Sequence, residues 1–548
     1  MSEPLRIVGG TVYDPAHGID GEVRDICIDA GKVVADVSTS ARRIDARGLV
    51  VMPGGVDIHS HVAGSSVNAA RRLLPEEHAA DPAPAPSLAD GEPWPRSGAG
   101  GTVPTTFTTG YRYAGLGYTT VFDAAVAPLH ARTSHAELDE TPIVDAGFYV
   151  LAGNDAYLWQ LIDRGERERA RQYVAWLLGA AGGYALKVVN PGGVELWKRG
   201  LRDRVGLDDA LGSTRVTARA ILETLCAAAD ELRLPHATHI HCNDLGVAGN
   251  IATTLASMQA LSGRRAHFTH VQFHAYASGP DGRRRSGARA LVEHINAHDS
   301  ITADVGQVMF GPATTLTADG AVEYLLYKSS GRKWVNSDIE LETGCGIVPH
   351  AYREKQSVAA LQWVVGLEIF LLAADPWRVV LSTDHPNGGS FLAYPELMRL
   401  LMDRTYRADC LKRVNPALLG GSALADGLGR EYTLREIAIV TRAGPARILG
   451  LRDKGHLGVG ADADVTIYTP NADWSAMFAT PRYVVKGGTL VVEEGHLRRA
   501  PRGGRLHVRP DYDRAIEGPL REFFDRHATV AFDNYPVRTL PDRPVPTS

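Results

Sequence analysis

Short runs of aliphatic and β-branched residues alternate with longer helical or irregular stretches through the middle of this 548-residue chain. This alternation is typical of βα units that build a parallel sheet. Consecutive units of this kind predict the α/β class and a closed (β/α)8 TIM barrel, in which functional groups lie at the C-terminal ends of the strands. The eight runs are residues 51–58, 118–124, 143–151, 184–190, 237–242, 266–271, 301–305 and 379–384.

Both ends of the chain have a different sequence pattern, in which short β-type segments are separated by glycine, aspartate and proline turn signals. Because the two ends look alike, we expect residues 1–52 and 431–497 to pair as one small β-sandwich beside a barrel of residues 53–430. Residues 79–95, rich in Ala, Pro and Asp, predict a loop or lid over the C-terminal face of the barrel. Residues 498–548 show no clear core periodicity and are interpreted as a C-terminal tail or a partner-contacting arm.

Composition and charge narrow the class of protein. Hydrophobic residues make up 44% of the chain and charged residues 22%, which is an ordinary globular balance and excludes wholesale disorder. With 58 basic and 63 acidic residues the formal net charge is −5, so there is no basic excess to bind a nucleic-acid backbone. We therefore expect no nucleic-acid partner.

Cysteine spacing and hydropathy indicate the compartment. The five cysteines have no C-x-x-C spacing, which argues against a disulfide framework, a zinc ribbon or an iron–sulfur cluster. The first residues do not resemble a secretion signal, and the most apolar stretch, residues 361–374, is too short to cross a bilayer. We expect a cytoplasmic protein with reduced thiols and no membrane contact. The cysteines are Cys27, Cys226, Cys242, Cys345 and Cys410.

Histidine pairs close two of the predicted strands. His59 and His61 follow the first run, and because side chains alternate along a strand, both imidazoles are expected to face the barrel lumen as metal ligands. A pair of structural histidines is the alternative. The fifth run ends in His239 and His241, and His241, nearer the mouth, is the better candidate ligand. His239 lies deeper and is expected to support a ligand or pack in the core.

The sixth run offers three histidines. His270 shares a face with Phe268 near the strand end and is the candidate ligand. By the same alternation His267 is expected to point toward the helical layer. His274 falls in the following loop, where contact with solvent and contact with substrate are both open.

A carboxylate and a lysine complete the candidate set. Asp384 ends the eighth run, and a metal-ligand or general-base role competes there with a helix N-cap role. Lys187 lies among apolar residues of the fourth run, so burial is expected to lower its pKa and populate the neutral amine. A neutral amine can add carbon dioxide to form a carbamate that bridges two cations. A lysine that reaches solvent is the alternative.

These six side chains, His59, His61, Lys187, His241, His270 and Asp384, predict a centre for two divalent metals. Nitrogen and oxygen ligands without a thiolate suit zinc first, with manganese, iron or nickel as alternatives. The segments around them carry a family pattern: residues 53–61, 441–451 and 460–464 resemble the amidohydrolase superfamily of metal-dependent barrels. The resemblance implies that Lys187 is an N6-carboxylysine bridging the metals. It also implies that His59, His61 and Asp384 bind one metal, and His241 and His270 the other.

Within that superfamily, residues 186–193, 239–246, 333–344 and 382–387 look most like A subunits of formylmethanofuran dehydrogenases and of bacterial formyltransferase/hydrolase complexes. This resemblance implies hydrolysis of N-formylmethanofuran or N-formylmethylofuran to formate and the free furan amine, with Asp384 as acid–base catalyst. It also implies the other subunits of such a complex as partners. The alternatives are a cyclic-amide hydrolase of the hydantoinase or dihydropyrimidinase type and a non-catalytic scaffold subunit. Substrate contact or loop hydrogen bonding stays open for Asn190, Asn336, Glu342 and His350.

Overall fold

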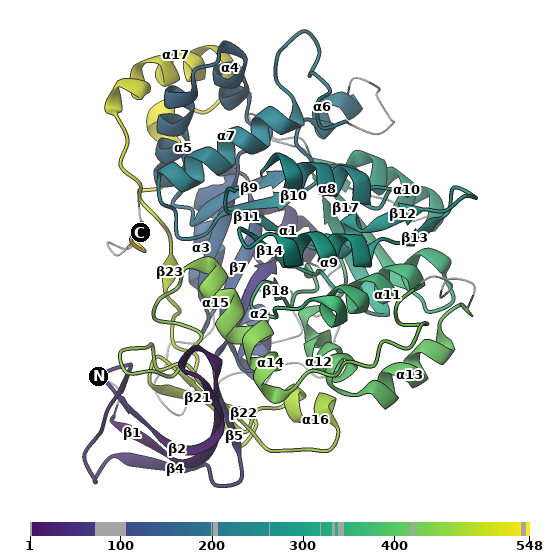
Figure 1. Ribbon diagram of the computed structural model, residues 1–548. Helices are drawn as coiled ribbons and strands as arrows, with labels where there is room; N and C mark the ends of the chain where they lie inside the picture. Colours follow the sequence, from purple (N-terminus) through teal and green to yellow (C-terminus); the bar gives the residue numbers. More distant parts are fainter. Residues whose placement is uncertain are drawn as a thin grey trace.

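The computed structural model in Figure 1 describes residues 3–71, 106–198, 200, 206–261, 263–317, 319–330, 335–337, 345–416, 419, 422–538 and 544–547. The predicted lid at residues 79–95 and Glu342 lie outside these residues.

Eight parallel strands form the central sheet, in the spatial order β18-β14-β11-β10-β9-β8-β7-β6. A parallel bridge between Ser60 and His385, with the His61 amide donating to the His385 carbonyl at 2.8 Å, joins the two ends of this sheet. The predicted (β/α)8 barrel is therefore confirmed. Its strands are β6 (Gly55–Ser60), β7 (Tyr118–Val126), β8 (Asp145–Leu151), β9 (Ala185–Val189), β10 (Thr238–His241), β11 (Ala266–Phe268), β14 (Ile301–Asp304) and β18 (Val379–Val380).

Helices surround this barrel, and small sheets extend its loops (Figure 1). The hairpin β12 (Tyr276–Ser278)–β13 (Arg284–Ser286) and the sheet β15 (Gly311–Thr317), β17 (Cys345–Tyr352), β16 (Val335–Ser337) are the extensions. The helices are α1 (Ser65–Ala70), α2 (Thr106–Gly115), α3 (Ala131–Glu140), α4 (Ala156–Arg164), α5 (Arg167–Ala181), α6 (Gly193–Lys198), α7 (Ala218–Glu231), α8 (Ile251–Ala260), α9 (Ala288–Ala297), α10 (Gly320–Ser330), α11 (Ser357–Leu372), α12 (Tyr394–Met402), α13 (Arg404–Arg413), α14 (Leu434–Ala438), α15 (Gly444–Leu449), α16 (Trp474–Ala479) and α17 (Glu517–His527).

A second sheet combines both ends of the chain, as predicted, and lies at the bottom of Figure 1. Its path is β22-β21-β20-β19-β5-β1-β2-β3, with β4 beside β1, so β19 and β5 join the late strands to the early ones. Its buried side chains form a separate hydrophobic cluster. The strands are β1 (Leu5–Asp14), β2 (Ile19–Asp29), β3 (Lys32–Val34), β4 (Arg42–Asp45), β5 (Val50–Pro53), β19 (Val465–Tyr468), β20 (Tyr483–Lys486), β21 (Thr489–Glu493) and β22 (His496–Leu497).

The run at residues 51–58 is two strands rather than the single strand predicted. β5 belongs to the terminal sheet, and β6 begins the barrel after a break at Gly54. The Gly54 amide donates to the Asp464 carbonyl at 2.8 Å, and a Cβ at this position would lie 2.2 Å from Thr119 Oγ1. Only glycine permits so close an approach, so the chain changes sheets here without losing its apolar pattern.

Buried charges join the barrel to the terminal sheet. Asp145, at the start of β8, accepts hydrogen bonds from Lys454 and, at 2.6 Å, from Lys486. Lys486 also contacts Asp464 at 2.9 Å. Burial alone would raise the pKa of Asp145, but Lys454 and Lys486 hold it well below its usual range. The carboxylate is therefore ionised in the folded chain at neutral pH.

Removing that carboxylate is expected to destabilise the chain strongly. Asp145→Ala removes one of the two carboxylates that the buried Lys454 and Lys486 share, and leaves both on Asp464 alone or with Asp462. Loss of one member of a buried ion pair costs about 3–5 kcal/mol. Because folding lowers the pKa of Asp145, its contribution is present above the unfolded pKa of about 3.9 and is lost as pH falls below it. Urea unfolding at several pH values measures both effects. A change below about 1 kcal/mol at pH 7 would contradict this role.

The C-terminal segment, interpreted from the sequence as a tail or a partner-contacting arm, packs on the barrel. β23 (Arg505–Leu506) pairs with β8 in parallel. The segment then passes along the barrel to α17, which lies beside α4 and α5 in Figure 1. There Phe523 packs on Tyr157 at a ring-centroid distance of 4.9 Å, and Phe532 stacks on Trp176 at 5.5 Å. Sparse aromatic residues, rather than a regular periodicity, anchor this segment.

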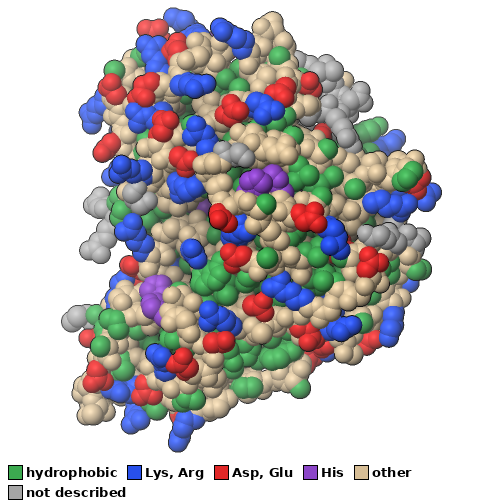
Figure 2. Space-filling model, viewed as in Figure 1, with side chains coloured by type: hydrophobic (Ala, Val, Ile, Leu, Met, Phe, Trp, Pro, Cys, Tyr) green, Lys and Arg blue, Asp and Glu red, His purple; other side chains and the backbone are tan. Residues whose placement is uncertain are grey.

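Acidic and basic side chains are interspersed over the face shown in Figure 2. This mixture agrees with the small net charge of the chain. Among the described residues, none of the helices combines the length and the apolar character that a membrane span requires.

Candidate metal centre

A cavity of about 1180 Å³ opens at the C-terminal ends of the barrel strands, and all six candidate side chains line it. They come from β6 and the residue after it, β9, β10, the residues after β11, and the loop after β18. Sequence reasoning could not measure how closely these strand ends approach. The structure brings all six residues to one cavity.

His59, His61 and Asp384 meet on one side of this cavity. Asp384 Oδ1 lies 2.8 Å from His59 Nε2 and 3.3 Å from His61 Nε2. His59 Nε2 is buried and has no hydrogen-bond partner within the described part of the chain. A lone pair and a carboxylate that face each other at this distance repel unless a proton or a cation lies between them. The donor set therefore fits a divalent cation.

Lys187 is fully buried on β9, directly beside His239 of β10 in the sheet register. No described residue forms a hydrogen bond with its Nζ. Burial lowers the pKa of this amine to about 7, although Asp384 and Asp304 oppose the shift. The expectation of a lysine whose head reaches solvent is excluded, and a large fraction of the neutral amine is present at neutral pH.

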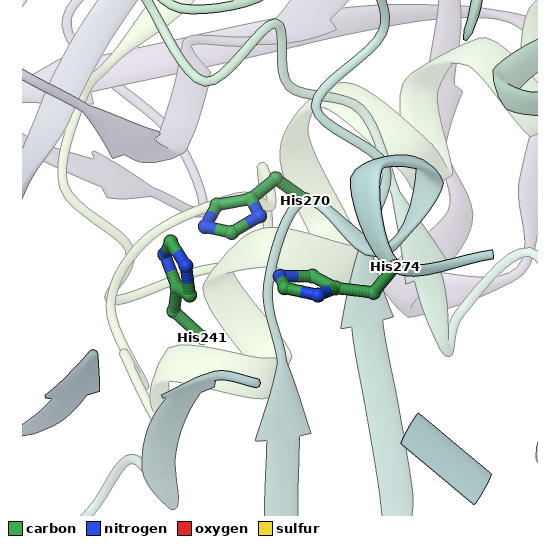
Figure 3. A group of neighbouring side chains, drawn as sticks. All are labelled: His241, His270 and His274. Carbon is green, nitrogen blue, oxygen red and sulfur yellow. The ribbon is translucent and has the colours of Figure 1, made fainter. Parts of the chain in front are cut away.

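Three imidazoles face one another on the other side of the cavity. Figure 3 shows His241, His270 and His274 with their rings turned toward a common space. One nitrogen from each ring lies within 4.8 Å of the others, and the ring centroids of His241 and His270 are 4.5 Å apart. His274, left open between solvent and substrate contact by the sequence, is buried beside the two candidate ligands.

The alternation argument fails in the sixth strand. β11 ends at Phe268, whose side chain packs in the hydrophobic core, while His267 lies beside Asp304 at 3.1 Å and stacks on His239. The prediction that His267 points toward the helical layer is wrong. His270 reaches the cavity because its own backbone is left-handed, with a φ of 35°. This conformation turns the chain after the strand has ended.

Left-handed residues follow other barrel strands too. Asn190 after β9, Asp244 after β10 and Asp384 after β18 have φ values of 43°, 62° and 48°. Asparagine, aspartate and histidine tolerate this conformation better than other non-glycine residues, and such strain gathers at functional sites. A run of these residue types directly after a buried strand is a usable sequence signal.

Electrostatics hold Asp384 ionised. Burial would raise the pKa of this carboxyl, but the polar groups around it, His270 first among them, hold it well below its usual range. Asn387 donates from its side-chain amide to Asp384 Oδ1 at 2.9 Å, and its own oxygen accepts from the Leu316 amide at 2.6 Å. Asn387 therefore fixes the position of the carboxylate.

Two acidic residues near the centre were missed by the sequence analysis. Asp304 ends β14, where its Oδ1 accepts from the His270 amide at 2.9 Å and its Oδ2 lies 3.7 Å from His59 Nδ1. Asp319 Oδ2 lies 2.9 Å from His241 Nε2. The position of Asp304 at the end of the seventh run was an available signal. Nothing in the sequence pattern placed Asp319 near the fifth strand.

The residues that the sequence left open for substrate recognition differ in where the structure places them. His350 lines the cavity and contacts Thr315 Oγ1 at 3.0 Å, and burial lowers its pKa to about 4. Asn190 accepts a hydrogen bond from Asn243 at 3.0 Å and supports the loop. Asn336 lies in β16, and its side chain is outside the described atoms.

A family model described as "Amidohydrolase family" matches residues 42–492. The chain belongs to the amidohydrolase family. Within this family, it is 41% identical to Protein FwdA of Methanocaldococcus jannaschii over 97% of this chain and 96% of that protein. It is 38% identical to the Fhc A subunit of the formyltransferase/hydrolase complex of Methylorubrum extorquens, again over 97% of this chain and 96% of the relative.

A solved structure agrees with this one over nearly the whole chain. The crystal structure of the formyltransferase/hydrolase complex (FhcABCD) from Methylorubrum extorquens in complex with methylofuran contains a chain that superposes with a TM-score of 0.92. The two chains are 37% identical, and the match covers 99% of each. The terminal sheet and the C-terminal segment are therefore included in the likeness.

Proposed function

We propose that this chain hydrolyses the formamide of N-formylmethanofuran or N-formylmethylofuran to formate and the free furan amine. The convergence of His59, His61, Lys187, His241, His270 and Asp384 on one cavity is the observation that carries the proposal. The likeness to the Fhc A subunit, and to a chain of the complex solved with methylofuran, supports this class of substrate.

Two divalent cations, zinc in first place, suit the donors that face the cavity. His59, His61 and Asp384 would hold one of them, and His241 and His270 the other. The buried Lys187 Nζ and His270 Nδ1, which find no hydrogen-bond partner among the described residues, support this assignment. So do His59 Nε2 and His241 Nε2, which face carboxylate oxygens at 2.8 and 2.9 Å. Such ions acidify a bound water and polarise a carbonyl oxygen when they are present.

Lys187 would bridge the two positions as N6-carboxylysine. The neutral Nζ attacks the carbon of carbon dioxide, an N–C bond forms as one C=O π bond becomes a C–O⁻ group, and the amine releases one proton to water. The product is an anionic carbamate with two oxygen donors. Burial of the Lys187 amine, which lowers its pKa to about 7, supports this reaction because it supplies the unprotonated nucleophile.

Asp384 would move the proton. The ionised carboxylate accepts the proton of the attacking water, and the same carboxyl group then donates it to the amide nitrogen as the C–N bond breaks. An amine leaves far more readily with that proton than as an anion. Asn387, which donates to Oδ1, keeps the carboxylate directed at the cavity.

The size of the cavity supports a substrate with a long tail, and the likeness to a chain of the FhcABCD complex supports a chain that works in an assembly. A volume of about 1180 Å³ far exceeds the space that a formyl group needs. We propose as partners the other subunits of a formyltransferase/hydrolase or formylmethanofuran dehydrogenase complex. A redox step, where one exists, belongs to those subunits.

Formate release from a formylated furan amine tests the proposal. We expect release by the native assembly, and by the isolated chain if the assembly is not required for activity, with about two zinc ions per chain by emission spectroscopy. Hydrolysis of dihydrouracil but not of the formyl amine would favour a cyclic-amide hydrolase. A chain that binds no metal and releases no formate, alone or assembled, would be a scaffold subunit.

A further inference from the structure

Three buried imidazoles form a hydrogen-bonded chain from the metal centre to the end of helix α15. His59 Nδ1 lies 2.8 Å from His239 Nε2, and His239 Nδ1 lies 3.0 Å from His236 Nε2. His236 Nδ1 in turn lies 3.0 Å from the backbone carbonyl oxygen of Ile448. Each of the three side chains is at most 1% exposed, so bulk water cannot replace its partners.

The Ile448 carbonyl fixes the direction of every donor in this chain. Ile448 lies in the last turn of α15, where carbonyl groups lack partners within the helix. A carbonyl oxygen only accepts, so His236 carries its proton on Nδ1. A neutral imidazole has a single N–H, so His236 Nε2 accepts from His239 Nδ1, and His239 Nε2 accepts from His59 Nδ1. The lone pair of His59 is consequently on Nε2.

Groups on both sides of His59 agree with this direction. The Thr269 hydroxyl contacts His59 Nδ1 and hydrogen-bonds Asp304, so its proton goes to the carboxylate. Its lone pair therefore shares the His59 Nδ1–H with His239 Nε2. On the opposite side, His59 Nε2 faces Asp384 Oδ1 at 2.8 Å. A cation between these two atoms is compatible only with an unprotonated Nε2.

We propose that His236 is a positioning residue for the metal centre. Through His239 it transmits the direction set by the Ile448 carbonyl and holds His59 in the Nδ1–H tautomer, which presents the Nε2 lone pair to the cation. The hydrogen bond made by one imidazole nitrogen decides whether the other is free to bind metal. In this chain that hydrogen bond is relayed through two further rings. The inference rests on the proposed function for the assignment of His59 as a ligand.

Two substitutions at one position separate this role from packing. In His236→Gln, the amide oxygen can accept from His239 Nδ1 while the amide NH₂ donates to the Ile448 carbonyl, so the direction is kept. In His236→Leu, a side chain of similar bulk does neither. Zinc affinity of the full chain, measured by competition with a chromogenic chelator, is expected to fall about 10- to 100-fold in the leucine variant. The glutamine variant is expected to stay within about threefold of wild type.

Equal losses in both variants would show that the ring only fills space, and an unchanged affinity in His236→Leu would show that it has no role. Either result overturns the inference. The tautomers can also be observed in the wild-type chain, so this second test does not depend on whether His236→Leu folds. Nitrogen-15 NMR of the metal-free, histidine-labelled full chain is expected to show Nδ1–H rings for His236 and His239, assigned by the signals lost in His236→Gln and His239→Gln.

An Nε2–H form of either ring would overturn the inference directly. This measurement is independent of catalysis. If the expected tautomers and the affinity pattern are found but no formyl amine is hydrolysed, the relay stands and the proposed reaction fails. If formate is released and the tautomers are reversed, the proposed reaction stands and the relay fails.

Discussion

Asp384→Asn is expected to lower turnover of the formyl amine by about 10²–10⁴-fold while the metal stays bound. The asparagine keeps an oxygen that can face His59 and His61, which lie 2.8 and 3.3 Å from Asp384 Oδ1. It cannot accept a proton from water or deliver one to the leaving nitrogen. Steady-state kinetics and emission spectroscopy on the same preparation measure the two properties separately.

Asp155→Asn provides a matched control for this exchange. Asp155 is another buried aspartate, which caps α4 by accepting from the Leu158 amide at 2.8 Å and does not line the cavity. Asparagine serves equally well as an N-cap, so this variant is expected to keep turnover within about twofold. An Asp384→Asn variant within tenfold of wild-type turnover would remove Asp384 from the acid–base role.

The barrel could be predicted from the sequence because its signal is local. Each barrel strand is buried on both faces and therefore appears as a short apolar run, whichever strands it pairs with. The ends of those runs identify the catalytic face, since parallel strands point the same way. His59, His241 and Asp384 follow from that rule alone, because each lies at the end of a run or directly after it.

The features that were missed depend on single backbone angles or on distant contacts. His270 enters the cavity through a φ of 35°, which no two-residue periodicity encodes. Alternation counted from His270 therefore put His267 on the wrong side of its strand. Gly54 moves the chain between sheets inside one apolar run. The contact between His236 and the Ile448 carbonyl joins residues 212 positions apart, so only the folded chain brings them together.

Supporting residues were missed for a related reason. A ligand is expected at a strand end, but the groups that orient it can come from any element that packs nearby. Asp319 contacts His241 from the loop after β15, and Asn387 holds Asp384 by contacting the backbone of Leu316 in β15. The extra sheet at the cavity therefore contributes to the centre, although it is not part of the barrel itself.

Lys187→Ala is expected to remove the bridge between the two metal positions, at least one of the bound metals, and turnover by about 100-fold or more. The substitution deletes a buried amine whose Nζ has no hydrogen-bond partner among the described residues, so little else is lost with it. Emission spectroscopy gives the metal content, and a formate assay gives turnover. Full metal occupancy together with full activity in this variant would refute the carbamate.

Lys187→Arg tests the carbamate more specifically than Lys187→Ala, because it keeps a long cationic side chain that cannot become a neutral nucleophile. Metal-free wild type reconstituted with zinc in buffer depleted of carbon dioxide is expected to stay largely inactive and to regain activity when bicarbonate is added. The arginine variant is expected to respond to neither condition. If wild type is fully active without carbon dioxide, or if Lys187→Arg is rescued by bicarbonate, the reaction at Nζ is not what assembles the centre. Loss of activity in both variants with no bicarbonate effect in wild type would instead assign Lys187 a role as an unmodified amine in the cavity.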